Sequence, residues 1–475
     1  MKAIRLLAIA MALTLAFSVQ GFAAAEIEIV NLNAGTGAGF DDPGAPVVAP
    51  GNPGTTIGEQ RLEAFKKAAE IWGAALDSSV KIRILASFEP LACDANSAVL
   101  GSAGPTTGVA NFPGAEYANT WYPIALANKL AGERLIPFPS NNLVQNATTL
   151  GEIRARFNSE LGQPDCFAGG GWYLGLDANE PTGQTDLVAV LLHEFGHGLG
   201  FLSFINKKTG TEFKGWPDVY SRLIRDNWTG INWGNTVPSI RRKTGVLGNI
   251  VFLGAEVTAT ADQVLSKPPH LKVTAPAAIA ASYDVGTASF GPAIKAAVSG
   301  ELVYPDDAGG ASSKDGCEAI GMDLTGKLAL IDRGTCNFTV KVKNAQNAGA
   351  KGVVIADNDP ANVPPPGLGG SDNSITIPSV RITKADGDTI KTALASTIQA
   401  TLEEDLASPT LAGADAADHV HLYAPPVVAP GSSVSHYDTT AYRNLLMEPF
   451  INSDLTHSVQ APEDLTLELL HDIGW

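Results

Sequence analysis

His193-Glu194-Phe195-Gly196-His197 is the stretch that decides the interpretation of this chain. Residues four apart lie on one face of an α-helix, so the two imidazoles can hold one metal ion between them. The glutamate beside the first histidine can then take a proton from a water that the metal activates. A chance match is expected about once per hundred chains of this length. The motif therefore predicts a Zn²⁺ site with His193 and His197 as ligands and Glu194 as the general base.

The run before the motif predicts the helix that carries it. Asp186 is a good N-terminal cap, and the apolar residues 187–192 suit a helix that is buried on most sides. Two histidines and a glutamate on such a helix would be costly to bury without a ligand. This context favours metal binding over coincidence.

The N-terminus has the features of a secretory signal, which we expect to span residues 1–25. Lys2 and Arg5 precede the apolar residues 6–17, and Ala23-Ala24-Ala25 offers a small-residue cleavage site. The alternative is an uncleaved anchor, for which the apolar stretch is short. We therefore expect a secreted or periplasmic protein without stable membrane association. The formal net charge of −17 argues against nucleic acid and anionic membranes as partners.

Four cysteines in an exported chain predict two disulfides. Three connectivities are formally open. Cys317 and Cys336 are close in sequence and are expected to pair, which leaves Cys93 to pair with Cys166. No two cysteines have C-x-x-C spacing, so a cysteine zinc site is the less favoured interpretation.

The length of 475 residues predicts two or three structural units. Residues 26–57 are rich in Gly and Pro and suggest an irregular edge or a partly ordered leader. Helical and strand patterns then alternate up to the motif helix, with a helix at 57–76 and a strand at 153–157, which predicts an α+β unit. Residues 201–270 have no diagnostic pattern, although 251–257 could form a strand. Residues 272–401 are instead β-rich, with strands at 328–331 and 353–356 around a helix at 340–348. Residues 402–475 no longer show this β-rich pattern, and they end in an apolar helix from residue 464.

The β-rich segment carries a specific sequence pattern. Residues 326–338 read G-K-L-A-L-I-D-R-G-T-C-N-F, and residues 348–350 read A-G-A before a strand. This segment closely resembles the protease-associated (PA) domain. The resemblance implies a small β-rich lid or binding module that is not itself catalytic. The module would be inserted between two parts of one catalytic unit, 26–271 and 402–475. We expect its deletion to leave zinc binding largely intact.

A catalytic zinc needs a third protein ligand. Ser203 stands where compact metzincin proteases have their third histidine, and serine cannot replace it. In leishmanolysin-like metzincins the third histidine lies further downstream and precedes a methionine turn. This chain resembles that arrangement, with His436 followed by Met447. The resemblance implies that His436 is the third ligand and that Met447 forms a hydrophobic floor, although a lone Met in an apolar run is usually core filler.

Other side chains compete for the third position, namely Asp438, His419, His421 and Glu448. Tyr437 and Tyr442 could stabilise an oxyanion but are interpreted as structural. The resulting fold prediction is an α+β, zincin-like metalloprotease domain with an inserted PA domain. The resulting function prediction is an exported zinc metalloendopeptidase acting on protein or peptide substrates. A zinc exopeptidase and a non-catalytic exported binding protein are the alternatives.

Overall fold

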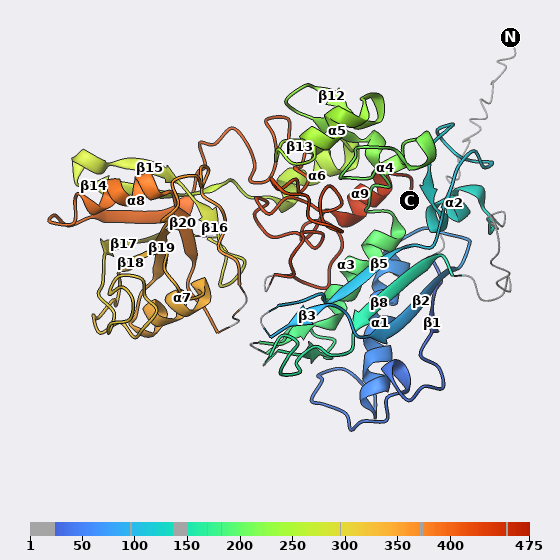
Figure 1. The fold of residues 1–475 in the computed structure, drawn as a ribbon, viewed down its shortest axis with the longest axis horizontal. Coiled ribbons are helices and arrows are strands. Elements are labelled where there is room, and N and C mark those ends of the chain that lie inside the picture. The colour runs from blue at the N-terminus through green and yellow to red at the C-terminus, as the bar shows by residue number, and fades with distance from the viewer. Residues whose placement is uncertain are drawn as a thin grey trace, which may run out of the picture.

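The computed structural model describes residues 24–135 and 151–475, apart from residues 96, 169, 182, 295, 371, 373, 453 and 454. The expected signal peptide lies almost wholly outside the described residues. The described chain forms two bodies side by side, both with helices and strands (Figure 1). The larger body contains residues 24–266 and 407–475, and the smaller body contains residues 269–404. Each helix within the described residues is too short or too polar to cross a lipid bilayer.

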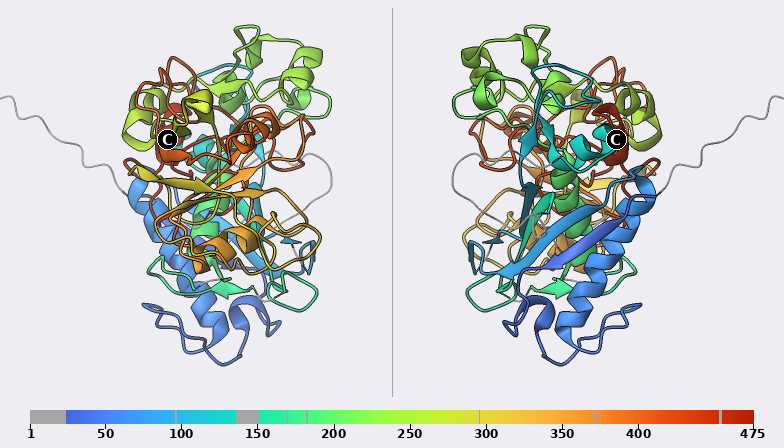
Figure 2. Two further views of the ribbon diagram at one scale, coloured as in Figure 1. Left: turned by 90° about the vertical axis from the view of Figure 1, so that its left-hand side faces the viewer. Right: turned by 90° about the vertical axis from the view of Figure 1, so that its right-hand side faces the viewer.

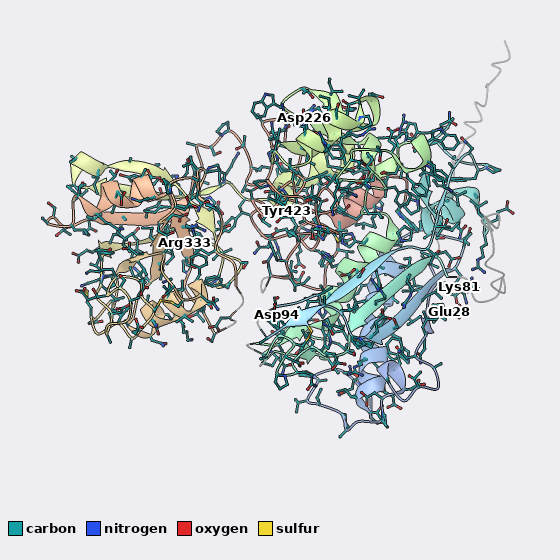
Figure 3. All side chains as sticks on the ribbon, in the orientation of Figure 1. Glu28, Lys81, Asp94, Asp226, Arg333 and Tyr423 are labelled. Atoms are coloured by element: carbon teal, nitrogen blue, oxygen red, sulfur yellow. A yellow bond between two sulfur atoms is a disulfide. The ribbon has the colours of Figure 1, made fainter. Side chains whose placement is uncertain are left out.

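A four-stranded sheet organises the larger body, with the strand order β1-β2-β8-β5. The first three strands are parallel, and the edge strand β5 is antiparallel to β8. The stretch expected to be irregular thus contributes a strand, because Ile27 and Ile29 pair in register with β2. Lys81 and Glu28 form an ion pair at this outer edge (Figure 3). The strands are β1 (Ile27–Asn31), β2 (Ile82–Glu89), β5 (Gly101–Pro105) and β8 (Ile153–Asn158).

Two helices, α1 (Ile57–Ala75) and α3 (Leu187–Leu199), pack on this sheet and on each other. The ring of Phe65 on α1 contacts aromatic rings on β2, β8 and α3, with centroid distances of 5.0–6.0 Å. Trp72 of α1 donates its indole N–H to the Leu192 carbonyl of α3. Figure 2 shows α1 running along the strands in the right-hand view. Predicted helix 57–76 and strand 153–157 are confirmed to within a residue or two.

Shorter elements complete the larger body. The segment 251–257, which resembles a strand in sequence, divides into the end of β13 and the start of α6. The helices are α2 (Ile124–Ala131), α4 (Val219–Arg222), α5 (Pro238–Thr244), α6 (Ala255–Val264) and α9 (Thr466–Asp472). The strands are β3 (Cys93–Asp94), β4 (Ser97–Ala98), β6 (Gly108–Val109), β7 (Tyr122–Pro123), β9 (Trp172–Tyr173), β10 (Thr185–Asp186), β11 (Ile224–Asp226), β12 (Ile231–Asn232) and β13 (Ile250–Phe252).

An eight-stranded mixed sheet forms the smaller body, with the order β15-β14-β21-β17-β18-β19-β20-β16. The predicted β-α-β element is confirmed as β18, α7 and β19, with the two strands parallel. The helices are α7 (Phe338–Asn347) and α8 (Lys384–Lys391). The strands are β14 (Pro269–Ala275), β15 (Ala281–Asp284), β16 (Gly286–Thr287), β17 (Val298–Val303), β18 (Leu328–Asp332), β19 (Gly352–Ala356), β20 (Ser379–Ile382) and β21 (Gln399–Glu404).

The chain enters and leaves the smaller body at neighbouring points. β14 pairs with β21 along its length, and the Asp405 N–H donates to the Pro268 carbonyl at 2.8 Å. The expected junctions at 272 and 401 fall inside these two strands. We therefore propose junctions just outside the strands, at about residues 268 and 405.

Both expected disulfides are present. Cys93 pairs with Cys166 in the larger body, and Cys317 pairs with Cys336 in the smaller body. The described residues contain no free cysteine. Each body is therefore cross-linked internally, and no disulfide joins one body to the other within the described part of the chain.

Candidate metal centre

Helix α3 positions the two motif histidines in the core of the larger body. The Asp186 carboxylate caps the helix by accepting the N–H groups of Val188 and Ala189, as the sequence predicts. The other carboxylate oxygen accepts a hydrogen bond from His457, at 2.8 Å. All residues of the helix are buried. The motif therefore lies on a fixed element, with its polar side chains shielded from bulk water.

Three glycines explain how this helix fits so tightly. A Cβ at Gly196 would lie 2.9 Å from the Met447 sulfur, and a Cβ at Gly198 would lie 2.4 Å from the Ile153 side chain on β8. Gly200 has a φ of 138°, outside the range that other residues favour, and it ends the helix. The chain turns there, so that the Phe201 carbonyl can reach back to His197.

The structure brings together the three predicted histidines, His193, His197 and His436. The Nε2 atom of His436 lies 3.2 Å from the Nε2 atoms of both other rings. All three side chains are buried, although His436 is 239 residues from His197 in sequence. Within the described residues, they form one of two groups whose side chains could hold a metal ion.

The hydrogen bonds of the three rings fix their tautomers. The Nδ1 atoms of His193, His197 and His436 face the carbonyls of Leu446, Phe201 and Ser432, at 2.7, 2.8 and 2.9 Å. A carbonyl can only accept, so each Nδ1 carries a hydrogen. Each Nε2 of a neutral ring then presents a lone pair to the other two. Lone pairs cannot hydrogen-bond to each other, so this arrangement fits a shared cation.

The donor set fits zinc. Around a tetrahedral Zn²⁺ with Zn–N distances of about 2.0–2.1 Å, two ligand nitrogens are about 3.3 Å apart. The observed separations of 3.2 Å agree with this spacing. Burial lowers the pKa of His193 to about 4 and that of His197 to about 3, and it lowers the pKa of His436 well below its usual value. The rings are therefore neutral at pH 7, as metal ligands must be.

Glu194 lies beside the histidines under the edge strand β5. The Ala103 N–H of β5 hydrogen-bonds to the Glu194 carboxylate, while the Oε2 atom is buried without a hydrogen-bond partner. Burial raises the pKa of Glu194 to about 8. A nearby cation would favour the carboxylate form. An unpartnered carboxylate oxygen and three inward-facing lone pairs thus both suit a positive charge at this place.

Met447 and the preceding residue, Leu446, contact the segments that carry the three histidines. The buried Met447 packs against Gly196 of α3, and its carbonyl accepts the Tyr437 N–H at 2.8 Å. The preceding carbonyl, that of Leu446, orients His193. The N–H of Leu446 donates to the buried Asp464 carboxylate. The segment around Met447 therefore touches both the motif helix and the segment that carries His436.

The competing ligands lie in other surroundings. His419 faces the Asp415 carboxylate and Arg225. Glu448 accepts hydrogen bonds from Leu445 and Asn452. Asp438 caps a turn at Thr440. His421 lies on a segment that pairs with the segment after His436, and its carbonyl accepts the Asp438 N–H. Of the proposed third ligands, the structure places only His436 with the motif histidines.

Sequence reasoning missed Lys207, whose ammonium is close enough to lower the pKa of His197 and of His436. It donates to the Ser203 carbonyl, and burial lowers the pKa of Lys207 to about 8. Ser203 itself hydrogen-bonds to Asp218 and Ser221. No sequence signal marks this lysine, because its position depends on how the chain folds back after Gly200.

A second group of potential ligands lies in the smaller body and consists of Asp307, Asp315 and Glu318. The buried ammonium of Lys341 lies among these carboxylates, and they raise its pKa against the larger effect of burial. Lys341 also donates to the Asp315 carbonyl at 2.5 Å. This group therefore already has a cation of its own.

Comparison with known proteins identifies the smaller body. Residues 298–390 match the PA domain family. The smaller body contains a PA domain. The segment whose pattern resembles that family contributes β18 and Cys336 to this body.

Curated relatives match only part of the chain. The vacuolar-sorting receptor 1 of Pisum sativum is 34% identical over 164 residues, which are 31% of this chain and 25% of the receptor. The aminopeptidase YwaD of Bacillus subtilis (strain 168) is 46% identical over 69 residues, which are 14% of this chain and 15% of that protein. The chain thus covers a quarter or less of these two relatives. They share a segment with it and leave the rest of each protein unmatched.

Similar solved structures also match a part of the chain. An aminopeptidase from Aneurinibacillus sp. strain AM-1 shows 27% identity and a TM-score of 0.22, and the match covers 31% of this chain and 37% of that one. The zinc aminopeptidase BSAP from Bacillus subtilis shows 28% identity and a TM-score of 0.21, covering 31% and 35%. Each match thus covers about a third of the chain.

Proposed function

We propose that this chain is an exported zinc-dependent peptidase that cleaves internal peptide bonds of proteins or peptides. The observation that carries the proposal is the meeting of three Nε2 lone pairs from His193, His197 and His436 beside the unpartnered carboxylate oxygen of Glu194. The order of the segments, with a distant third histidine followed by Met447, supports a metzincin-like site of the leishmanolysin-like kind. The two disulfides support the proposed export from the cytoplasm.

In this proposal the three histidines hold the zinc ion through Nε2, and their Nδ1–H groups keep the rings oriented by donating to backbone carbonyls. A zinc ion held there supplies Lewis acidity, which polarises a carbonyl and makes a water easier to deprotonate. Glu194 takes the proton from the attacking water and delivers it to the departing amine nitrogen. The Ala103 N–H keeps the carboxylate turned toward the site.

The position of β5 favours an endopeptidase. β5 is the edge strand of its sheet, and within the described residues no strand pairs with its outer edge. A Cβ at Gly101 of β5 would lie 3.2 Å from a Glu194 oxygen, so this edge passes directly over the general base. An extended peptide can add to such an edge as a further strand. A substrate held along its backbone would extend past the site in both directions, which suits internal cleavage.

The test is the variant Glu194→Gln, which keeps the histidines and removes the base. We expect zinc content equal to that of the wild type and a loss of turnover on a casein-type protein substrate of about 10²–10⁴-fold. The matched control is Glu448→Gln, another buried glutamate, for which we expect turnover within a few-fold of the wild type. Near-normal turnover in Glu194→Gln would refute the proposed role of Glu194. Peptides with blocked and free termini would separate internal cleavage from exopeptidase action.

The second candidate is a non-catalytic exported binding protein. It is favoured by the PA domain and by the partial match to proteins named vacuolar-sorting receptors. Under this alternative the wild type would bind peptides without cleaving them, and Glu194→Gln would behave like the wild type in every assay. The buried, unpartnered Glu194 oxygen is then left without a role, which is why we prefer the peptidase.

A further inference from the structure

A loop between His436 and Met447 joins the metal centre to the smaller body. We call residues 437–447 the tyrosine loop. Its base is closed by the hydrogen bond from the Tyr437 N–H to the Met447 carbonyl. Ala441 and Leu445 of the loop pack in the core of the larger body, while the side chain of Tyr442 enters the core of the smaller body. A residue of the larger body thus completes the core of the smaller one.

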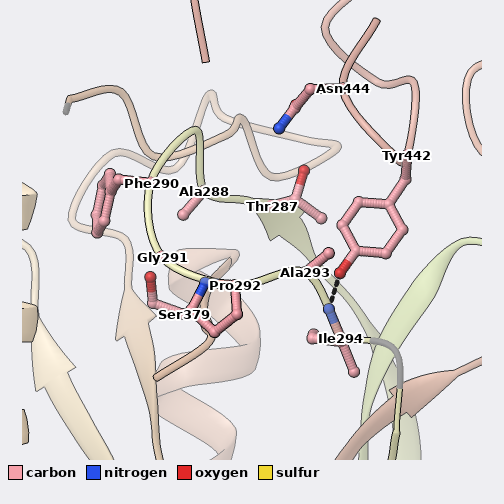
Figure 4. A pocket seen from close by; sticks show the side chains of 10 residues that line it. All are labelled: Thr287, Ala288, Phe290, Gly291, Pro292, Ala293, Ile294, Ser379, Tyr442 and Asn444. Atoms are coloured by element: carbon pink, nitrogen blue, oxygen red, sulfur yellow. Dashed lines mark hydrogen bonds between the residues drawn. The ribbon is translucent and has the colours of Figure 1, made fainter. Parts of the chain in front are cut away.

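Tyr442 is held by its ring, its hydroxyl and its backbone. The residue is 6% exposed and packs in the same buried cluster as Leu271 and Val380 of the eight-stranded sheet. Its hydroxyl oxygen accepts the Ile294 N–H, which Figure 4 shows as a dashed line. Its carbonyl accepts the Ser266 N–H at 2.6 Å. The ring and hydroxyl contacts fix the tip of the tyrosine loop on the smaller body, and the carbonyl contact fixes it on the crossing segment at Ser266.

The same place joins both crossings of the chain between the bodies. Ser266 lies just before β14, and its carbonyl accepts the N–H of Ala412, which lies after β21. Ala412 is itself part of the buried cluster around Tyr442. The two crossing segments and the tyrosine loop therefore form one hydrogen-bonded assembly, and the loop cannot shift without disturbing it.

The other end of the tyrosine loop reaches the metal ligands. Leu446 is four residues from Tyr442, and its carbonyl accepts the Nδ1–H of His193. His436 is six residues from Tyr442 on the other side. A chain extends by at most about 3.6 Å per residue, so a large displacement of Tyr442 would also displace the backbone beside both ligands. The loop is short, so a large movement of its tip would strain the hydrogen bond between Tyr437 and Met447 that closes its base.

We propose that Tyr442 is a positioning residue through which the smaller body holds His193 and His436 in the geometry that binds the metal. The inference rests on the zinc site proposed above. It also reverses an expectation from sequence alone. Removal of residues 269–404 would leave the Tyr442 ring without its pocket and the tyrosine loop without its contacts to the smaller body, so such a deletion should weaken zinc binding.

The experiment measures zinc affinity of full-length variants by competition with a chromophoric chelator. We expect Tyr442→Ala to weaken zinc binding about ten-fold or more, and Tyr442→Phe to stay close to the wild type because the ring remains. The matched control is Tyr283→Ala, because Tyr283 is 7% exposed in the same core and its hydroxyl donates to the Ile279 carbonyl of its own body. Unchanged affinity in Tyr442→Ala would overturn the proposal. An equal loss in Tyr283→Ala would also overturn it, since general loosening of the core would then explain both.

A second measurement needs no variant and covers the case in which Tyr442→Ala does not fold. Coupling between two sites is reciprocal, so zinc must stabilise the docking of Tyr442 if that docking stabilises zinc. We expect hydrogen exchange of the Ile294 amide in the wild type to slow when zinc is added, while the Leu330 amide in the sheet stays constant. Unchanged exchange at Ile294 in zinc-loaded protein would refute the coupling alone. A wild type that binds no zinc would instead refute the proposed function, and this inference with it.

Discussion

The sulfur of Met447 lies against Gly196, so close that a Cβ at residue 196 would be 2.9 Å from it. This contact explains why glycine stands between Glu194 and His197 on the motif helix. The contact also fixes the position of the Met447 segment relative to the histidines. The carbonyl of the neighbouring Leu446 accepts a hydrogen bond from His193. The packing and the ligand orientation are therefore two results of one contact.

Gly196→Ala should push Met447 and Leu446 away from α3. We expect a loss of unfolding free energy of about 1–3 kcal/mol, the usual effect of overpacking, together with weaker zinc retention. Denaturant unfolding and metal analysis of the same samples would measure both. Gly104→Ala on β5 is the control, because a Cβ there would meet nothing within 4 Å. If both variants behave alike, the Met447 contact has no special role.

His436→Ala should lose zinc during dialysis against a mild chelator, because only two of the three Nε2 ligands would remain. His419→Ala and His421→Ala should keep it, since neither side chain lies with the motif histidines. Metal content per protein after dialysis decides the matter. Retention by His436→Ala, with loss in either of the other variants, would show that the third ligand is wrongly assigned.

Asp186→Ala should remove the cap of the motif helix and leave the buried Val188 N–H without its partner. The expected loss of unfolding free energy is about 0.5–2 kcal/mol, as for other caps. Asp186→Asn keeps an acceptor at the same position and should lose less. Urea denaturation of the three proteins gives the comparison, and an Asn variant as unstable as the Ala variant would argue against capping.

Asp357 should make the smaller body sensitive to acid. Burial alone would raise the pKa of Asp357, but hydrogen bonds from Asp359, Asn362 and Arg333 outweigh it and lower the pKa to about 2. A depressed carboxyl pKa contributes stability above the unfolded value of 3.8, and this stability is lost as the pH falls toward 2. The contribution at neutral pH is about 2 kcal/mol.

The measurement for Asp357 is the melting temperature of the smaller body between pH 5 and pH 2. We expect Asp357→Asn to flatten its decline, while the exposed neighbour variant Asp359→Asn should follow the wild type. A decline in Asp357→Asn as steep as in the wild type would show that other carboxylates control the acid response.

Local patterns in the sequence were enough for the parts of the fold that depend on neighbouring residues. The cap at Asp186, the helix before His193, the β-α-β element of the smaller body and both disulfide pairs are confirmed. In each case one short stretch contains the signal, except for Cys93 and Cys166, which are 73 residues apart and remained once Cys317 and Cys336 were paired. The PA domain was also recognisable, because its pattern is contained in residues 326–350.

Features that depend on distant partners were not predictable in the same way. β1 has a Gly- and Pro-rich sequence around it, and it is a strand only because β2 offers an edge in register. Segment 251–257 has strand-like residues, but its second half becomes α6, whose first turn is capped by the distant Asp472. Lys207 and Tyr442 are positioned by contacts with other segments, and the residues next to them in sequence give no sign of these contacts.

The crossing points at Ser266 and Ala412 have a consequence for the order of folding. Bringing His436 to His197 requires closing a loop of 239 residues, which is entropically expensive in an unfolded chain. If the smaller body folds first, it brings its own two ends together and shortens the remaining loop by more than half. This lowers the closure cost by about 0.8 kcal/mol. The inserted domain would then act during biogenesis as an internal folding clamp, and the zinc site would be among the last features of the chain to form.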